Sequence, residues 1–108
     1  IIVGSSFGGL MAAVFACKNP EKVRRLILLA PPLSWYDFSS HILHKLRLPV
    51  IIYHGRHDDV VPVEPVHRMA HRIFANLSFH TLDDDHLLSR HFLGLDWPKL
   101  LGTGLQTG

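Results

Sequence analysis

Cysteine is almost absent from the sequence, which contains only one, Cys17, among 108 residues. A single thiol cannot form a disulfide within the chain, so the small secreted folds that disulfides hold together are excluded. The same scarcity fits a reducing compartment, and we expect a cytoplasmic location. Long apolar runs are also missing. None approaches the roughly 18 residues that a membrane-crossing helix needs, so we expect no membrane span.

Charged residues are sparse as well, at 19% of the chain, with a formal net charge of +2. The basic side chains are scattered, and the longest basic run is the pair Arg24-Arg25. Nucleic-acid-binding proteins gather Lys and Arg on one face, so this pattern indicates no nucleic-acid partner. Apolar residues, by contrast, are plentiful at 47%, which is typical of a globular protein. At this length we expect at most one domain with a modest core.

The chain opens on a short apolar stretch that leads into a turn of small residues. The β-branched residues 1–3 predict a buried strand, and residues 4–8 (GSSFG) then match the pattern G-x-S-x-G. This pattern is called a nucleophile elbow, because a sharp strand-to-helix turn exposes the serine hydroxyl. Glycines are expected two positions before and after the serine, where the backbone passes too closely for a Cβ. Ser6 is therefore a candidate nucleophile, the alternative being a small residue in a glycine-rich turn.

Apolar runs alternate with helical patterns along the rest of the chain. Besides residues 1–3, apolar runs predict strands at residues 25–30 and 49–53, and the alternation of apolar and polar residues predicts an edge-like strand at residues 77–82. Helical spacing predicts helices at residues 8–17, 64–75 and 87–92, with one short amphipathic helix within residues 35–48. We expect a short turn at residues 97–101 and a frayed tail at residues 102–108. The alternation predicts an α/β fold, with a parallel sheet of about four strands and flanking helices.

Reactive side chains follow three of the predicted strands. Parallel strands place their carboxyl ends at one edge of the sheet, where the active sites of such folds lie. Ser6 follows the first strand, residues 57–59 (HDD) the third and residues 83–86 (DDDH) the fourth. A serine hydroxyl needs a base to accept its proton and a carboxylate to orient that base. The residues therefore predict a Ser-Asp-His set, with Asp58 or Asp59 as the acid and His57, His80 or His86 as the base.

Four stretches of the chain carry a resemblance to a known family. They are residues 4–9 (GSSFGG), 19–23 (NPEKV), 54–62 (HGRHDDVVP) and 85–87 (DHL). Together they resemble the C-terminal half of an α/β-hydrolase-fold serine hydrolase, in which nucleophile, acid and base follow one another in this order. The resemblance extends over nearly the whole chain to about residue 101. It implies that residues 1–101 are the C-terminal part of a single α/β-hydrolase domain.

The resemblance also implies a role for each candidate residue. Residues 54–62 resemble the acid loop of the family, which selects Asp58 over Asp59, and a position after the last core strand implies His86 as the base. The backbone N–H of Phe7 would contribute to the oxyanion hole. The implied activity is that of an esterase-like or thioesterase-like enzyme, which cleaves a small-molecule acyl substrate through an acyl-enzyme. No cofactor is implied.

One part of the family pattern does not occur in this sequence. The second oxyanion donor of the family comes from a loop after an earlier strand, and neither that loop nor the strands before the elbow are found here. The alternative is therefore a non-catalytic or incomplete hydrolase-fold domain, which acts in binding or is inactive as given. We expect the isolated 108-residue piece to be inactive.

Histidine and aromatic residues raise two further alternatives. His67 and His71 are four residues apart on one predicted helix, but the glutamate of the H-E-x-x-H zinc motif is not there. A solvated helix face explains this pair better, and we expect no metal site. Three aromatic residues at positions 35, 36 and 38 follow the second strand, where they either line an acyl pocket or pack in the core.

Overall fold

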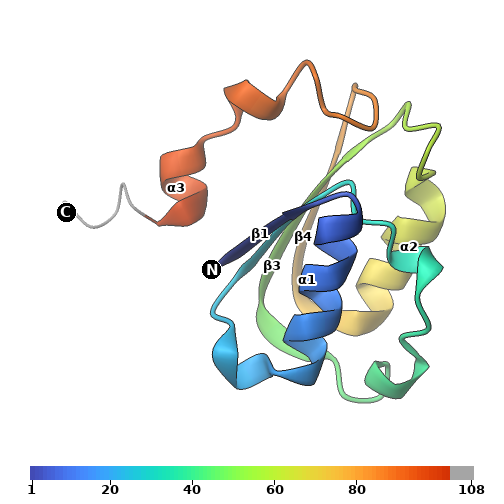
Figure 1. Cartoon of the computed structure of the whole chain (residues 1–108), viewed down its shortest axis with the longest axis vertical. Helices are drawn as coiled ribbons and strands as arrows, with labels where there is room; N and C mark the ends of the chain where they lie inside the picture. The colour runs from blue at the N-terminus through green and yellow to red at the C-terminus, as the bar shows by residue number, and fades with distance from the viewer. Residues whose placement is uncertain (103–108) are drawn as a thin grey trace.

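A computed structural model, which describes residues 1–102, contains a four-stranded sheet in which every neighbouring pair of strands is parallel (Figure 1). The strands lie in chain order: β1 (Ile2–Ser5), β2 (Leu26–Leu29), β3 (Leu46–Gly55) and β4 (Phe74–Leu82). The predicted α/β class with about four strands is confirmed. Parallel pairing also means that all four carboxyl ends lie at one edge of the sheet.

Two helices, α1 (Phe7–Lys18) and α2 (Val63–Ile73), pack on the same face of this sheet (Figure 1). Alternate residues of a strand point to opposite faces, so one set of strand side chains meets the helices. Leu28 of β2 and Ile52 of β3 are fully buried in a cluster with Ala13 of α1 and Val66 of α2. The alanines of α1 let that helix approach the strands closely.

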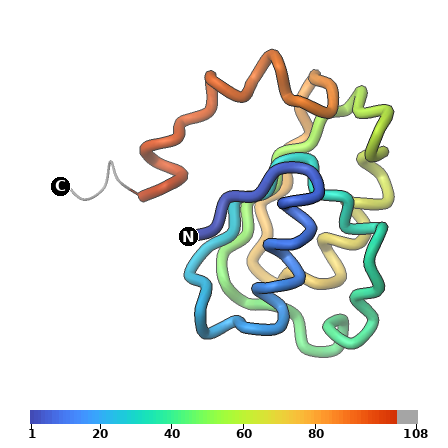
Figure 2. The backbone as a smooth tube through the Cα atoms, in the orientation of Figure 1, coloured from blue at the N-terminus to red at the C-terminus, as the bar shows by residue number. Residues whose placement is uncertain are grey.

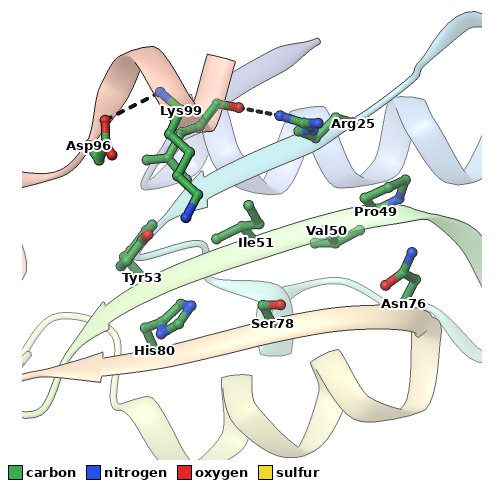
Figure 3. Close-up of a pocket in the computed structure, with 11 residues that line it drawn as sticks. Arg25, Pro49, Val50, Ile51, Tyr53, Asn76, Ser78, His80, Asp96 and Lys99 are labelled. Atoms are coloured by element: carbon green, nitrogen blue, oxygen red, sulfur yellow. Dashed lines mark hydrogen bonds between the residues drawn. The ribbon is translucent and has the colours of Figure 1, made fainter. Parts of the chain in front are cut away.

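The opposite face of the sheet carries a groove beside α3 (Trp97–Leu101). Figure 3 shows Tyr53 of β3 and His80 of β4 on the floor of this groove, with Lys99 above them. The groove has a volume of about 620 Å³. The Arg25 guanidinium donates a hydrogen bond to the Leu100 carbonyl and ties α3 to the start of β2.

The predicted amphipathic helix within residues 35–48 is wrong. This segment forms two 3₁₀ turns, Leu33–Trp35 and Ser39–His41, and β3 already begins at Leu46. The apolar residues that suggested helical spacing do not share one face, since Leu43 is 89% exposed while Leu46 is buried in the strand. Leu46 instead pairs with Phe74 of β4, so the end of this segment belongs to the sheet.

The predicted helix at residues 87–92 is also wrong, because this segment contains turns and only a 3₁₀ turn at Phe92–Gly94. Leu88 is buried and has a φ of 55°, a left-handed conformation that no α-helix accepts. Figure 2 shows the backbone from the end of β4 passing along the carboxyl edge of the sheet toward α3. The short turn expected at residues 97–101 is α3 itself.

The predicted helix at residues 64–75 is shorter than expected, because α2 ends at Ile73 and β4 follows at once from Phe74. Of the predicted tail at residues 102–108, only Gly102, which ends α3 with a φ of 78°, is described; the remainder lies outside the described residues. Among the helices of residues 1–102, none has the length and apolar character needed to cross a membrane.

Candidate active site

Ser6 lies at the sharp turn between β1 and α1, with φ 52° and ψ −125°. Such a φ is unfavourable for a residue with a Cβ and persists only where the surroundings hold it. Here the Ser6 N–H donates to the Leu29 carbonyl at 2.7 Å, and the Ser6 carbonyl accepts from the N–H groups of Gly9 and Leu10 at 2.8 and 3.1 Å. Hydrogen bonds on both sides of the residue therefore hold the serine in its strained conformation.

Only one of the two expected glycines is required by close packing. A Cβ added to Gly4 would lie 2.7 Å from both the Gly8 carbonyl oxygen and the Gly9 Cα. A Cβ added to Gly8 would have no neighbouring atom within 4 Å, so the predicted need for glycine at this position is wrong. Gly9 is tight instead, since its Cβ would lie 3.1 Å from the Gly4 oxygen and from the Pro31 side chain. The close approach joins Gly4 to the first turn of α1.

The Ser6 hydroxyl meets a histidine from the far end of the chain. Ser6 Oγ lies 2.8 Å from His86 Nε2, and the other ring nitrogen of His86, Nδ1, lies 2.7 Å from Asp58 Oδ2. These residues follow β1, β4 and β3, whose carboxyl ends parallel pairing places at one edge. The structure thus brings together the three residues selected from the sequence.

The Asp58 carboxylate is buried, and both of its oxygens have hydrogen-bond partners. Oδ1 accepts hydrogen bonds from the N–H groups of Val60 and Val61 at 2.9 and 2.7 Å, and Oδ2 faces His86. Its side chain has no exposed area, whereas that of His86 is 14% exposed. A carboxylate only accepts hydrogen bonds, so Nδ1 of His86 carries a hydrogen and Nε2 of the neutral ring is left as the acceptor for the Ser6 hydroxyl.

The rival candidates from the sequence lie elsewhere. His57 pairs with Asp83 at 2.7 Å on the surface, with both side chains at least 60% exposed. His80 stacks on Tyr53 in the groove on the opposite face of the sheet. Asp59 is exposed. Neither His57 nor His80 is within hydrogen-bond distance of Ser6 in the described part of the chain.

The loop that carries His86 is anchored by a residue that sequence reasoning did not single out. Asp84 is only 3% exposed, and its Oδ2 accepts from the backbone N–H groups of Arg90 and His91 and from His91 Nδ1 at 2.9 to 3.0 Å. Its Oδ1 accepts from the Asp85 N–H at 2.8 Å. Burial raises the pKa of Asp84, but the His91 side chain and these N–H groups outweigh it and leave the pKa below its usual value. Nothing in a run of three aspartates reveals which one is buried.

The acid loop and the histidine loop are also tied to each other directly. The backbone N–H of His57 donates to the Asp84 carbonyl at 3.0 Å, and the Arg56 N–H donates to the Leu82 carbonyl at 2.7 Å. Gly55 lies at this junction, where an added Cβ would collide with the carbonyl oxygens of Asp84 and Asp85. The backbone therefore holds Asp58 and His86 in a fixed relative position.

Phe7 begins α1 directly after Ser6. The N–H groups in the first turn of a helix have no acceptor within the helix, so a donor here is available to a negatively charged oxygen. The Phe7 side chain is 58% exposed.

Of the three aromatic residues after β2, Phe38 is fully buried in the core and Tyr36 packs against it, while Trp35 is 59% exposed. The core alternative therefore holds for Phe38. His67 and His71 lie with their Nε2 atoms 3.2 Å apart on α2. Among residues 1–102, no group of three or more His, Cys, Asp or Glu side chains is arranged to hold a metal ion.

The strand-elbow-helix unit and the parallel sheet match known proteins. A family model described as the alpha/beta hydrolase fold matches residues 1–44. A solved structure from Coxiella burnetii, an α/β serine hydrolase homologue, is 30% identical with a TM-score of 0.70, over 85% of this chain and 43% of that one. The chain has part of the α/β-hydrolase fold.

Two further solved structures show the same hydrolase fold. A protein from Thermoplasma acidophilum, described as a predicted CIB-like hydrolase, is 21% identical with a TM-score of 0.72, over 100% of this chain and 51% of that one. The esterase domain of a Rhodothermus marinus protein is 21% identical with a TM-score of 0.63, over 82% of this chain and 51% of that one. The chain thus spans about half the length of these structures. No curated protein sequence matches it.

Proposed function

We propose that the protein is a serine hydrolase that cleaves an ester, a thioester or a related acyl bond, with Ser6 as nucleophile, His86 as general base and Asp58 as the acid that orients the base. The observation that supports this most directly is the continuous hydrogen-bonded path from Ser6 Oγ through His86 to Asp58, with distances of 2.8 and 2.7 Å. A structural serine in a turn has no need for a buried carboxylate two contacts away.

In the first half of the proposed reaction, Ser6 Oγ attacks the acyl carbon while its proton passes to His86 Nε2. The imidazolium that forms is stabilised by the Asp58 carboxylate. The negative charge on the former carbonyl oxygen is stabilised by the Phe7 N–H. When the tetrahedral intermediate collapses, His86 gives its proton to the departing alkoxide or thiolate, and the acyl group stays on Ser6.

In the second half, His86 removes a proton from a water molecule as the water oxygen attacks the acyl-enzyme. The second tetrahedral intermediate collapses, the proton returns to Ser6 Oγ, and the carboxylic acid leaves. Every proton transfer uses the same nitrogen of His86, which the hydrogen bond between Nδ1 and Asp58 keeps available. No redox step or cofactor is involved. The substrate is accordingly a small acyl compound with an alcohol or thiol leaving group.

The proposal is tested with the full-length protein that carries this sequence and a short-chain p-nitrophenyl ester as substrate. We expect Ser6→Ala to lower kcat by about 10⁴-fold or more, and Asp58→Asn to lower it by a factor on the order of 10³ to 10⁴, because the wrong His86 tautomer is then favoured.

The chain offers a matched control for each of these variants. Ser5 lies on β1 beside Ser6 and is exposed, and Asp59 is the exposed neighbour of Asp58. Ser5→Ala and Asp59→Asn should keep kcat within about twofold of the parent, because neither changes a group that acts on the substrate. Turnover that survives Ser6→Ala would contradict the proposal.

A further inference from the structure

One buried imidazole is not used in the proposed reaction. His54 lies in β3, four residues before Asp58, and has no exposed area. Its Nε2 lies 2.7 Å from the Val61 carbonyl oxygen and 3.3 Å from Asp58 Oδ2. Its ring also lies nearly parallel to that of Phe79, with ring centroids 6.4 Å apart. His54 therefore lies against the acid of the proposed site, and both side chains are fully buried.

The protonation state of His54 follows from these contacts. A carbonyl oxygen only accepts, so Nε2 carries a hydrogen and donates it to the Val61 carbonyl, and Asp58 Oδ2 lies 3.3 Å from the same nitrogen. Burial lowers the pKa of His54, which outweighs the opposing effects of Val61 and Asp58, and the ring is neutral near pH 7. Its Nδ1 then bears a lone pair, and this buried atom has no hydrogen-bond partner among the described residues.

An unpartnered buried nitrogen is unfavourable, and an apolar side chain at position 54 would not leave one. The other ring nitrogen, Nε2, belongs to a closed set of contacts among His54, Val61 and Asp58, which we call the circuit. His54 donates to the Val61 carbonyl, the Val61 N–H donates to Asp58 Oδ1 at 2.7 Å, and Asp58 Oδ2 lies near His54 again. This circuit fixes the Val61 peptide and, through it, the plane of the Asp58 carboxylate.

We propose that His54 is a positioning residue, which holds the Asp58 carboxylate in the orientation that His86 requires through its contacts with the Val61 carbonyl and with Asp58 itself. The inference rests on the proposed function. His54 does not touch the substrate. Its loss should therefore reduce the rate of the chemical steps and leave substrate binding nearly unchanged.

The test measures kcat and KM of the full-length protein for a short-chain p-nitrophenyl ester. We expect His54→Leu to lower kcat by roughly 10-fold to 100-fold, as a misplaced catalytic group does, with KM within about twofold of the parent. His54→Gln should recover most of this loss, because its amide N–H reaches the position of Nε2. His54→Asn is the shorter amide and should not recover it.

A double-mutant cycle separates positioning from a general structural role. If His54 acts through Asp58, then His54→Leu should change the residual kcat of Asp58→Ala by less than about twofold. An equal loss in both backgrounds, or an unchanged kcat in His54→Leu, would overturn the inference. Should His54→Leu fail to fold, the Gln and Asn pair decides, and equal activity in these two variants overturns it.

The outcome also separates this inference from the proposed function. If the parent protein shows no turnover that depends on Ser6, both fail. If turnover depends on Ser6 while the His54 variants behave as the parent does, only the role of His54 fails.

Discussion

At the scale of single residues, Ser6 combines two properties that a turn serine does not need. Its φ of 52° is unfavourable, and its hydroxyl contacts an imidazole that a buried carboxylate orients. Strain of this kind amounts to about 1–3 kcal/mol and persists where the surrounding hydrogen bonds hold the backbone. The strained turn directs Oγ toward His86, so the strained backbone places the hydroxyl where the proposed chemistry needs it.

The glycines around Ser6 provide the sharpest residue-scale prediction. Gly4→Ala should destabilise the protein by about 1–3 kcal/mol and reduce any hydrolytic activity, because its Cβ has no room beside the start of α1. Gly8→Ala is the matched control. Its Cβ meets open space inside a helix, so stability should stay the same or rise by up to about 1 kcal/mol. Urea unfolding of the three proteins measures both changes, and similar destabilisation by the two substitutions would contradict the geometry of the elbow.

At this scale the sequence predicts a residue's role where a pattern carries chemistry. The order of Ser6, Asp58 and His86, with the loop motif of residues 54–62, selected three residues that lie within hydrogen-bond distance. The sequence pattern does not indicate the roles of His54 and Asp84, because these roles depend on burial. It also expected glycine to be required at position 8, whereas the close contact falls on Gly9.

At the scale of elements, the loop of residues 83–91 depends on one buried carboxylate. Asp84 accepts hydrogen bonds from three backbone N–H groups and from one ring nitrogen, all within this loop. The pKa of Asp84 lies below its usual value. A carboxylate with a lowered pKa in the folded state stabilises the protein above its unfolded pKa, and this contribution is lost as the pH falls through the folded value. The loop should therefore loosen in acid.

We expect Asp84→Asn to lower the melting temperature by several degrees at pH 7, because the amide NH₂ group would face backbone N–H groups that are themselves donors. The difference from the parent should shrink as the pH falls from about 4, near the pKa of the unfolded state, through the lower pKa of the folded carboxylate, below which the parent is also protonated. Asp83→Asn is the control. Its carboxylate is 60% exposed, and its substitution should change the melting temperature little at any pH. A constant gap between parent and Asp84→Asn across this pH range would contradict the assignment.

Strands and helices were predictable to different degrees. Apolar runs predicted the first three strands and alternation predicted the fourth, because β2 is buried along its length whereas β4 is largely exposed. The segments at residues 35–48 and 87–92 were not predictable from spacing. Leu46 pairs with Phe74 of β4, and Leu88 is buried in a left-handed conformation, so long-range contacts decide both cases.

At the scale of the whole molecule, β1 is an edge strand of the sheet within residues 1–102, and β2 is its one neighbouring strand there. Ile1 and Val3 are 53% and 45% exposed there, and an apolar cavity of about 500 Å³ lies between β1 and the segment of residues 92–101. An exposed apolar edge strand offers unpaired N–H and C=O groups to other chains. We therefore predict that the 108-residue chain, produced alone, self-associates and shows little hydrolytic activity.

Sedimentation velocity at several concentrations checks this prediction. The expected result is a weight-average mass that rises with concentration, and a Val3→Lys substitution at the edge should reduce that rise. A monodisperse monomer that also hydrolyses esters would show that residues 1–108 suffice for a folded and complete site.

The central claim is that Ser6 is the nucleophile of a serine hydrolase. The most direct measurement is labelling of the full-length protein with a fluorophosphonate, which reacts with a serine activated by a neighbouring base, followed by peptide mass mapping. We predict one adduct, on the peptide that contains Ser6, which is lost in Ser6→Ala, strongly reduced in His86→Ala and retained in Ser5→Ala. Labelling at another residue, or labelling of the Ser6→Ala protein to the same extent as the parent, would contradict the account.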